Sequence, residues 1–263
     1  MQIWEAALLG LIQGLTEFLP VSSSGHLVLF QELLGLKEPG VTLEVILHFG
    51  TLLSVFWVFR HDFLNLLKFR QDKSQAKLML LLIIGIIPTG LIGLIINRYT
   101  DILFQSILLV GIMLIVTGII LKILTFLPAG RNSVKGMQFK DALWIGIFQG
   151  FAVIPGISRS GSTIMAAIWR GLDRDTAVRY SFMLAAPAIL GATLLEMREL
   201  LVTGIESVQI LHYSIGGLIS FLSGVAAIKI FINLLARHKF QYFAYYCWII
   251  GLIVITVAMF GRN

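Results

Sequence analysis

Six apolar segments constrain the fold of this chain more than any other feature of its sequence. They lie at about residues 43–59, 78–96, 102–121, 178–195, 209–231 and 242–260. A helix needs about 20 apolar residues to cross a bilayer core roughly 30 Å thick. The composition agrees, since 57% of the 263 residues are hydrophobic and 13% are charged, whereas soluble domains have about 45–50% and about 25%. We therefore predict an all-α integral membrane protein that forms one membrane domain over residues 1–263.

The charged residues and the single cysteine exclude several other classes of protein. The formal net charge of +6 comes from basic residues in short loops rather than on one face, so we expect no nucleic-acid partner. Cys247 is the only cysteine, which excludes an internal disulfide and a cysteine-based metal site. No basic region followed by a cleavage site marks the N-terminus, so no cleaved signal peptide is expected.

Two further apolar regions are shorter and end at turn-forming residues. Residues 6–19 precede Pro20 and "VSSSGH", and at about 1.5 Å per residue they extend only about 21 Å. Residues 142–154 precede "PGISRSGST" in the same way. Irregular backbone at membrane depth is tolerated where it is buried in protein or faces water. We therefore predict two re-entrant helical hairpins in addition to the six transmembrane helices.

The basic residues of the loops predict the orientation of the chain. If each hairpin enters and leaves on one side, fourteen Lys and Arg residues lie in one set of loops and four lie in the other. The first set comprises residues 60–77, 122–140, 170–179 and 233–241, and the four on the other side are Lys37, Arg98, Arg198 and Arg262. Loops rich in basic residues face the cytoplasm. Both termini and the 196–206 loop are then predicted to lie outside.

The two hairpins match each other at a constant offset of 136 residues. The matching pairs are Gly10 and Gly146, Gln13 and Gln149, Gly14 and Gly150, Ser22 and Ser158, Ser24 and Ser160, and Gly25 and Gly161. A hairpin followed by three spans thus occurs twice, over about residues 1–125 and 138–263, and the odd number of spans gives the copies opposite topology. Inverted repeats place their site near the midplane. We expect the tips "PVSSSGH" and "PGISRSGST" to face each other across a buried cavity.

Glu17 is the first candidate for chemistry, because an ionised carboxylate at membrane depth costs roughly 2.5–3.5 kcal/mol. It lies one helical turn after Gln13, on the same face. We interpret Glu17 as a metal ligand or a proton acceptor. The alternative is a structural glutamate that a neighbouring group neutralises.

The residues after the break are also candidates. Ser22, Ser23 and Ser24 have the residue type of helix N-caps, and their backbone amides with that of Gly25 could form an anion cradle. His26 is a candidate general acid, base or nucleophile. The alternative for His26 is a core histidine bonded to a carbonyl.

Arg159 is the only arginine in either tip, and a guanidinium in such a turn is typical of phosphate or carboxylate recognition. The alternative is a stabilising ion pair between Arg159 and Glu17. Glu44 and His48 are four residues apart on one helix face. They could line the entrance to the site, help to hold a metal, or be a plain packing pair.

Together, "QGLTEFLPVSSSGH" and "PGISRSGST" closely resemble the undecaprenyl-diphosphate phosphatase family, also called the bacitracin-resistance family, and the resemblance covers essentially the whole chain. The first motif of the family falls on Gln13 and Glu17, and its serine and histidine fall on Ser23 and His26. Its second motif falls on Pro155, Gly156, Ser158, Arg159, Ser160 and Thr163. Gln13 departs from members that have a second glutamate there, and it can contribute only a neutral oxygen.

The resemblance implies hydrolysis of undecaprenyl diphosphate to undecaprenyl phosphate and inorganic phosphate. This reaction recycles the lipid carrier for peptidoglycan and confers bacitracin resistance. The implied location is the bacterial cytoplasmic (inner) membrane, with the site open to the outer, periplasmic side and Mg²⁺ or Ca²⁺ as cofactor. A homodimer is one assembly to be tested. The implied catalytic residues are Glu17, Ser23, His26 and Arg159, the phosphate-binding residues are Ser22, Ser24, Gly25, Gly156, Ser158, Ser160 and Thr163, and the metal ligands are Glu17 and Gln13.

Two other functions compete with this interpretation. Type-2 phosphatidic-acid phosphatases need a histidine and an aspartate where this chain has Met165 and Trp169, so that class is rejected. A transporter or flippase for undecaprenyl phosphate or another anion would share the inverted repeat. Within the phosphatase interpretation, Ser23, His26 and water all stay open as the nucleophile. On the premise that Glu17 is unpaired, Glu17→Gln is expected to leave stability unchanged or improved.

Overall fold

The computed structural model describes residues 1–36, 41–128, 130–203, 207–236 and 240–260, and all regular structure in these ranges is helical. The helices are α1 (Ile3–Phe18), α2 (Ser23–Leu33), α3 (Val41–Val58), α4 (Arg60–Leu66), α5 (Lys73–Asn97), α6 (Thr100–Gln105), α7 (Ile107–Phe126), α8 (Phe139–Phe151), α9 (Arg159–Trp169), α10 (Arg174–Thr203), α11 (Ser207–Ala236) and α12 (Phe240–Phe260). The prediction of an all-α protein is confirmed.

Five helices, namely α5, α7, α10, α11 and α12, are long and apolar enough to cross a membrane. A sixth span is available if α3 and α4 count as one, because these helices bend by 75° at the break between them. The described part of the chain therefore has the five or six membrane-spanning helices of a multi-pass membrane protein.

The structure corrects the bounds of several predicted segments. The predicted span 102–121 begins too early, because Ser106 ends α6 and caps α7 by accepting a hydrogen bond from the Leu109 amide at 3.2 Å. The predicted loops 170–179 and 196–206 are largely helical, since α10 runs from Arg174 to Thr203. Four basic residues of the orientation prediction lie outside the described residues: Lys37, Arg237, Lys239 and Arg262.

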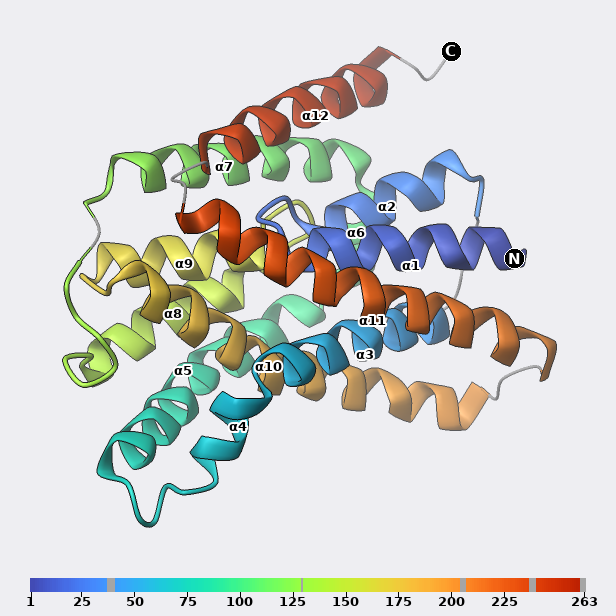
Figure 1. Ribbon diagram of the computed structural model, residues 1–263. Coiled ribbons are helices and arrows are strands. Elements are labelled where there is room, and N and C mark those ends of the chain that lie inside the picture. Colours follow the sequence, from blue (N-terminus) through green and yellow to red (C-terminus); the bar gives the residue numbers. More distant parts are fainter. Residues whose placement is uncertain (37–40, 129, 204–206, 237–239, 261–263) are drawn as a thin grey trace.

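The two short helix pairs have the same local design. Helices α1 and α8 each begin with a capping box, formed by Gln2 with Glu5 and by Gln138 with Asp141. Figure 1 shows the pairs α1–α2 and α8–α9 entering the helix bundle from opposite ends, with their connecting turns close together near its middle. The first pair packs mainly through α1 on α11, and the second mainly through α8 on α5.

Glycines allow these helices to approach closely. A Cβ atom at Gly10 would overlap the carbonyl oxygen of Gly216 on α11, and one at Gly146 would overlap the carbonyl oxygen of Gly85 on α5. Small residues at such crossings are typical of helix packing in membranes. The short helices are thereby held directly against long helices, which fixes where their tips lie.

The main apolar core surrounds α10 and anchors the end of α1. The Phe182 ring contacts the rings of Phe18, Phe59 and Phe231, with centroids 5.6, 5.6 and 5.9 Å away. Phe18 and Phe182 are fully buried. Because Phe18 follows Glu17 directly, this packing also limits the positions that the Glu17 side chain can adopt.

The glycine contact of α8 predicts a difference between two alanine substitutions. We expect Gly146→Ala to lower the free energy of unfolding by about 1–3 kcal/mol, because overpacking forces the helices apart. The matched control is Gly90→Ala on α5, where an added Cβ atom would point into open space, with no neighbouring heavy atom within 4 Å. In this control the free energy of unfolding should rise by at most about 1 kcal/mol, because alanine has a higher helix propensity than glycine. Thermal unfolding in one detergent measures both, and equal midpoints would contradict the close approach.

Candidate functional site

An ion pair joins the two hairpins. Arg159 Nη2, at the start of α9, lies 2.8 Å from Glu17 Oε1, near the end of α1. The exposed fractions of these side chains are 16% and 5%, so the pair is largely withdrawn from solvent. The alternative that the sequence left open, an ion pair of Arg159 with Glu17, is therefore present in this structure.

The break after α1 follows from the local sequence. Leu19 has ψ of 141°, outside the helical region, as the ring of a following proline favours. The chain then turns at Ser22, which has φ of 69°. The Ser22 hydroxyl accepts the Gly25 amide at 3.3 Å and so caps α2.

The second tip contacts the first directly. The Ser22 hydroxyl also accepts the Gly156 amide at 3.1 Å, and Gly156 turns the second tip with φ of 94°. Ser158 caps α9 by accepting the Gly161 amide at 3.1 Å, as Ser22 caps α2. The two tips thus face each other, as the sequence predicted, and they touch directly; the buried cavity between them stays a prediction.

Glu17 is the centre of a network of polar groups from both tips. Its Oε2 atom accepts hydrogen bonds from the Ser23 hydroxyl at 2.5 Å and from Gln13 Nε2 at 3.0 Å. His48 on α3 is an electrostatic neighbour of the same carboxylate. Each oxygen of Glu17 therefore has its own partners, with Arg159 on Oε1 and two neutral groups on Oε2.

His26 is held at both ring nitrogens. Its Nδ1 atom lies 2.8 Å from the Ser22 carbonyl oxygen, and its Nε2 atom lies 2.8 Å from the Tyr246 hydroxyl on α12. Sequence reasoning missed Tyr246, because an aromatic residue in a span is typical of an interface anchor. It also missed Thr117 on α7, whose Oγ1 donates to the Gly156 carbonyl at 2.7 Å and accepts the Ser158 amide at 3.0 Å.

The remaining predicted residues have other partners. Thr163 Oγ1 lies 2.5 Å from Ser181 Oγ on α10, and Ser160 Oγ lies 3.3 Å from the Ser158 hydroxyl. The Ser24 hydroxyl lies 3.4 Å from that of Ser22. The Thr163 hydroxyl thus connects α9 to α10 rather than to the other tip, while Ser24 and Ser160 each lie beside a capping hydroxyl.

The hydrogen bond between His48 and Glu44 involves the backbone of Glu44. His48 Nδ1 lies 2.8 Å from the backbone carbonyl oxygen of Glu44, and Glu44 Oε1 accepts a hydrogen bond from Gln31 Nε2 on α2 at 3.0 Å. Glu44 therefore joins α3 to α2.

The donor atoms that could hold a divalent cation are few. Among the described residues, no group of three His, Cys, Asp or Glu side chains could bind a metal. However, the amide oxygen of Gln13 is buried and has no hydrogen-bond partner in the protein, and it belongs to the residue beside Glu17 Oε2. Mg²⁺ and Ca²⁺ prefer such oxygen donors, and Mg²⁺ usually keeps several waters or substrate oxygens as further ligands. Glu17 and Gln13 thus supply oxygen donors of this type, with the Gln13 amide turning its Nε2 atom rather than its oxygen toward Glu17 Oε2.

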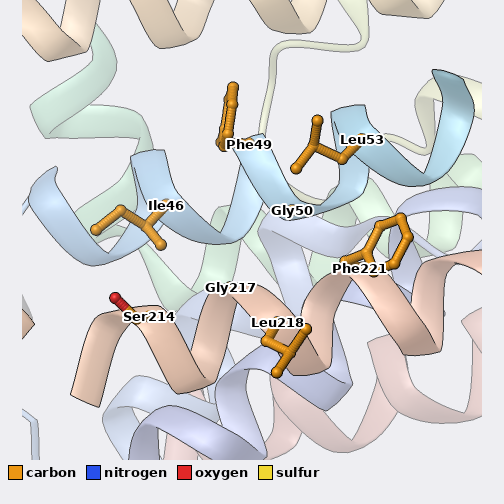
Figure 2. Close-up of a pocket in the computed structure, with 8 residues that line it drawn as sticks. All are labelled: Ile46, Phe49, Gly50, Leu53, Ser214, Gly217, Leu218 and Phe221. Atoms are coloured by element: carbon orange, nitrogen blue, oxygen red, sulfur yellow. The ribbon is translucent and has the colours of Figure 1, made fainter. Parts of the chain in front are cut away.

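A separate apolar groove lies between α3 and α11 and has a volume of about 310 Å³ (Figure 2). It is lined by Ile46, Phe49, Gly50, Leu53, Ser214, Gly217, Leu218 and Phe221. Its α3 residues lie on the opposite face of that helix from His48. None of these lining residues is titratable, so this groove offers no group for acid–base chemistry, and we take the polar cluster at the tips as the candidate site.

Comparisons with known proteins identify the family of the chain. A family model described as bacitracin resistance protein BacA matches residues 6–253. The undecaprenyl-diphosphatase of Halothermothrix orenii is 48% identical over 258 residues, which cover 98% of this chain and 99% of that protein. Proteins of the same name from Alkaliphilus metalliredigens and Carboxydothermus hydrogenoformans are 42% and 39% identical, and the matches cover 98% and 100% of this chain and the full length of each relative.

The ion pair changes the expected effect of Glu17→Gln. The premise that Glu17 is unpaired is wrong, because Arg159 is its partner. The substitution therefore leaves a mostly buried guanidinium without that partner. Breaking a buried pair costs about 3–5 kcal/mol, and because Arg159 is partly exposed we expect about 2 kcal/mol of lost stability. Thermal unfolding in detergent measures this, with Glu32→Gln at an exposed position as the control. A wild-type midpoint for Glu17→Gln would show that the pair does not stabilise the fold.

Proposed function

The chain belongs to the bacitracin resistance protein BacA family, and we propose that it is an undecaprenyl-diphosphatase. It hydrolyses undecaprenyl diphosphate to undecaprenyl phosphate and inorganic phosphate, and so recycles the lipid carrier for cell-wall synthesis. Relatives of this name align over the whole chain at up to 48% identity. The structural observation that carries the proposal is the meeting of Glu17, Ser23 and Arg159 at the two tips. The comparisons support the phosphatase and not the transporter.

Arg159 is proposed to bind the diphosphate. A guanidinium carries five N–H donors in a plane and matches the geometry of phosphate oxygens. Among the described residues, the Arg159 side chain donates one hydrogen bond, from Nη2 to Glu17, which leaves other donors for a substrate. The N-termini of α2 and α9 meet beside it, and helix N-termini favour anions. Positive charge and amide donors therefore converge where the diphosphate would lie.

Glu17 and Ser23 are proposed to carry the chemistry. The Ser23 hydroxyl donates to Glu17 Oε2 at 2.5 Å, so the carboxylate can take its proton as Ser23 attacks the terminal phosphorus. The anhydride P–O bond then breaks and undecaprenyl phosphate leaves, and water releases phosphate from Ser23. Ser23 is favoured over His26 as nucleophile because both ring nitrogens of His26 already have partners. The surrounding residues need only position and stabilise charge.

We propose Mg²⁺ or Ca²⁺ as the cofactor, held by Glu17 and the Gln13 amide oxygen. The support is the unpartnered Gln13 oxygen. Such an ion would supply positive charge against the diphosphate. The other predicted binding residues, Ser22, Ser24, Gly25, Gly156, Ser158, Ser160 and Thr163, are proposed to shape the tips, within which the Gly25, Gly156 and Ser158 amides already donate hydrogen bonds.

The repeat architecture and orientation are also proposals. Two inverted repeats, over about residues 1–125 and 138–263, with re-entrant hairpins, are supported by the matching capping boxes and by the glycine contacts of α1 and α8. The distribution of basic residues supports a site open to the outer side of the inner membrane. Lys135→Cys in a Cys247→Ser background should then be labelled from the cytoplasm, and labelling from outside would reverse the orientation. The homodimer stays a prediction that light scattering in detergent tests.

Phosphate release by the purified protein tests the function. We expect undecaprenyl diphosphate to yield one inorganic phosphate per molecule, a metal chelator to stop release, and Mg²⁺ or Ca²⁺ to restore it. Release that a chelator does not affect would contradict the cofactor but not the activity. Transport of undecaprenyl phosphate without phosphate release would contradict the phosphatase.

Substitutions at Arg159 test the proposed binding mode. We expect Arg159→Lys to be nearly as inactive as Arg159→Ala, because an ammonium cannot reproduce the planar fork. The loss should be about 3 kcal/mol or more, a factor of at least about 10² in kcat/KM. Arg179→Lys is the control, since Arg179 pairs with Asp62 and Asp175 away from the tips. If Arg159→Lys kept half the activity, Arg159 would be only a structural partner of Glu17.

A further inference from the structure

Tyr246 on α12 hydrogen-bonds the His26 side chain from outside the two hairpins. Its hydroxyl lies 2.8 Å from His26 Nε2, and the two rings are nearly parallel, at 9°, with centroids 5.7 Å apart. The residues are 220 positions apart in the chain. The contact therefore depends on the assembled fold and not on local sequence.

The contact of the other ring nitrogen of His26, Nδ1, determines which of the two nitrogens carries the proton. His26 Nδ1 lies 2.8 Å from the Ser22 carbonyl oxygen, and a carbonyl oxygen can only accept, so Nδ1 carries a proton. In the neutral ring, Nε2 is then the acceptor, and the Tyr246 hydroxyl is the donor. The bond made by one nitrogen of a histidine fixes the role of the other.

Ser22 connects this arrangement to the proposed site. Its carbonyl holds His26, while its hydroxyl accepts the Gly156 amide of the second tip at 3.1 Å. His26 is only 4% exposed, whereas Tyr246 is 41% exposed. Tyr246 thus lies between a buried imidazole and the surface of the protein.

We propose that Tyr246 is a positioning residue that holds His26 in its Nδ1-protonated form and orientation beside the Ser23 turn. The proposal rests on the proposed phosphatase function, since it takes His26 to be one of the surrounding residues that position groups and stabilise charge in that reaction. Removal of the Tyr246 hydroxyl should leave Nε2 without its donor and let the imidazole exchange between orientations. The rate of the reaction should then fall while lipid binding persists.

The test compares Tyr246→Phe with Tyr245→Phe in the full-length protein. Tyr245 is the neighbouring residue on α12, and its hydroxyl accepts a hydrogen bond from Lys122 rather than contacting His26. For Tyr246→Phe we expect kcat for undecaprenyl diphosphate to fall about tenfold, as loss of one hydrogen bond that positions a group of the site implies, with KM within about twofold. Tyr245→Phe should keep the wild-type kcat and KM.

A spectroscopic measurement separates positioning from a merely structural role. In protein labelled with ¹⁵N-histidine, the His26 signals, assigned by their loss in His26→Gln, should report the Nδ1-protonated tautomer. They should shift toward a mixture of tautomers in Tyr246→Phe and not in Tyr245→Phe. The thermal midpoint of Tyr246→Phe should stay within about 2 °C of wild type, because the substitution removes one oxygen from a part-exposed ring.

Two results would overturn the proposal. One is a wild-type kcat in Tyr246→Phe, and the other is a reduced kcat with unchanged His26 signals. If the wild-type protein releases no phosphate from undecaprenyl diphosphate, the proposed function fails. The ¹⁵N signals then decide alone whether Tyr246 holds the imidazole, and unchanged signals in Tyr246→Phe would reject that contact too.

Discussion

The contact between the two hairpin tips is the interaction on which the rest of the structure depends. A helix that stops inside a membrane leaves backbone groups that lipid cannot satisfy. Here each tip provides partners for the other, through the Ser22 hydroxyl and the Gly156 amide, and Thr117 on α7 satisfies two further groups of the second tip. The long helices hold the tips at this meeting point, with glycines that let α1 and α8 lie against α11 and α5.

The two hairpins share a backbone design but carry different chemistry. At the offset of 136 residues, Ser23 corresponds to Arg159, Glu17 to Val153 and His26 to Ser162. The capping serines and the close-packed glycines are kept in both copies, whereas the carboxylate is in one and the guanidinium in the other. Because the tips meet, these opposite charges form one buried pair, which a single hairpin could not do. In the proposed function, this asymmetry places one carboxylate and one guanidinium together at the site for an anionic substrate.

The sequence predicts the local features of this arrangement well. Pro20, the serines and the matching glycines identify both breaks, since proline and cap preferences act over a few residues. Contacts between distant helices could not be predicted in the same way. Tyr246 and Thr117 lie in apolar helices, and the residues next to them in the sequence do not indicate a polar partner. Thr163 is predicted among the phosphate-binding residues, and the contact of its hydroxyl with Ser181 on α10 was not foreseen from the sequence.

The two carboxylate oxygens of Glu17 have different partners and therefore different roles. Oε1 neutralises Arg159, and Oε2 accepts from Ser23 and Gln13. A substitution that removes the carboxylate therefore removes a counter-ion and a base together, so lost activity alone does not identify its role. Ser23 contacts only Oε2 in this network and carries no charge, and its removal leaves the ion pair intact. The two oxygens thus have different partners. A diphosphate that binds Arg159 would compete with Oε1 for the guanidinium while leaving Oε2 on the Ser23 hydroxyl, where the proposed mechanism needs a base.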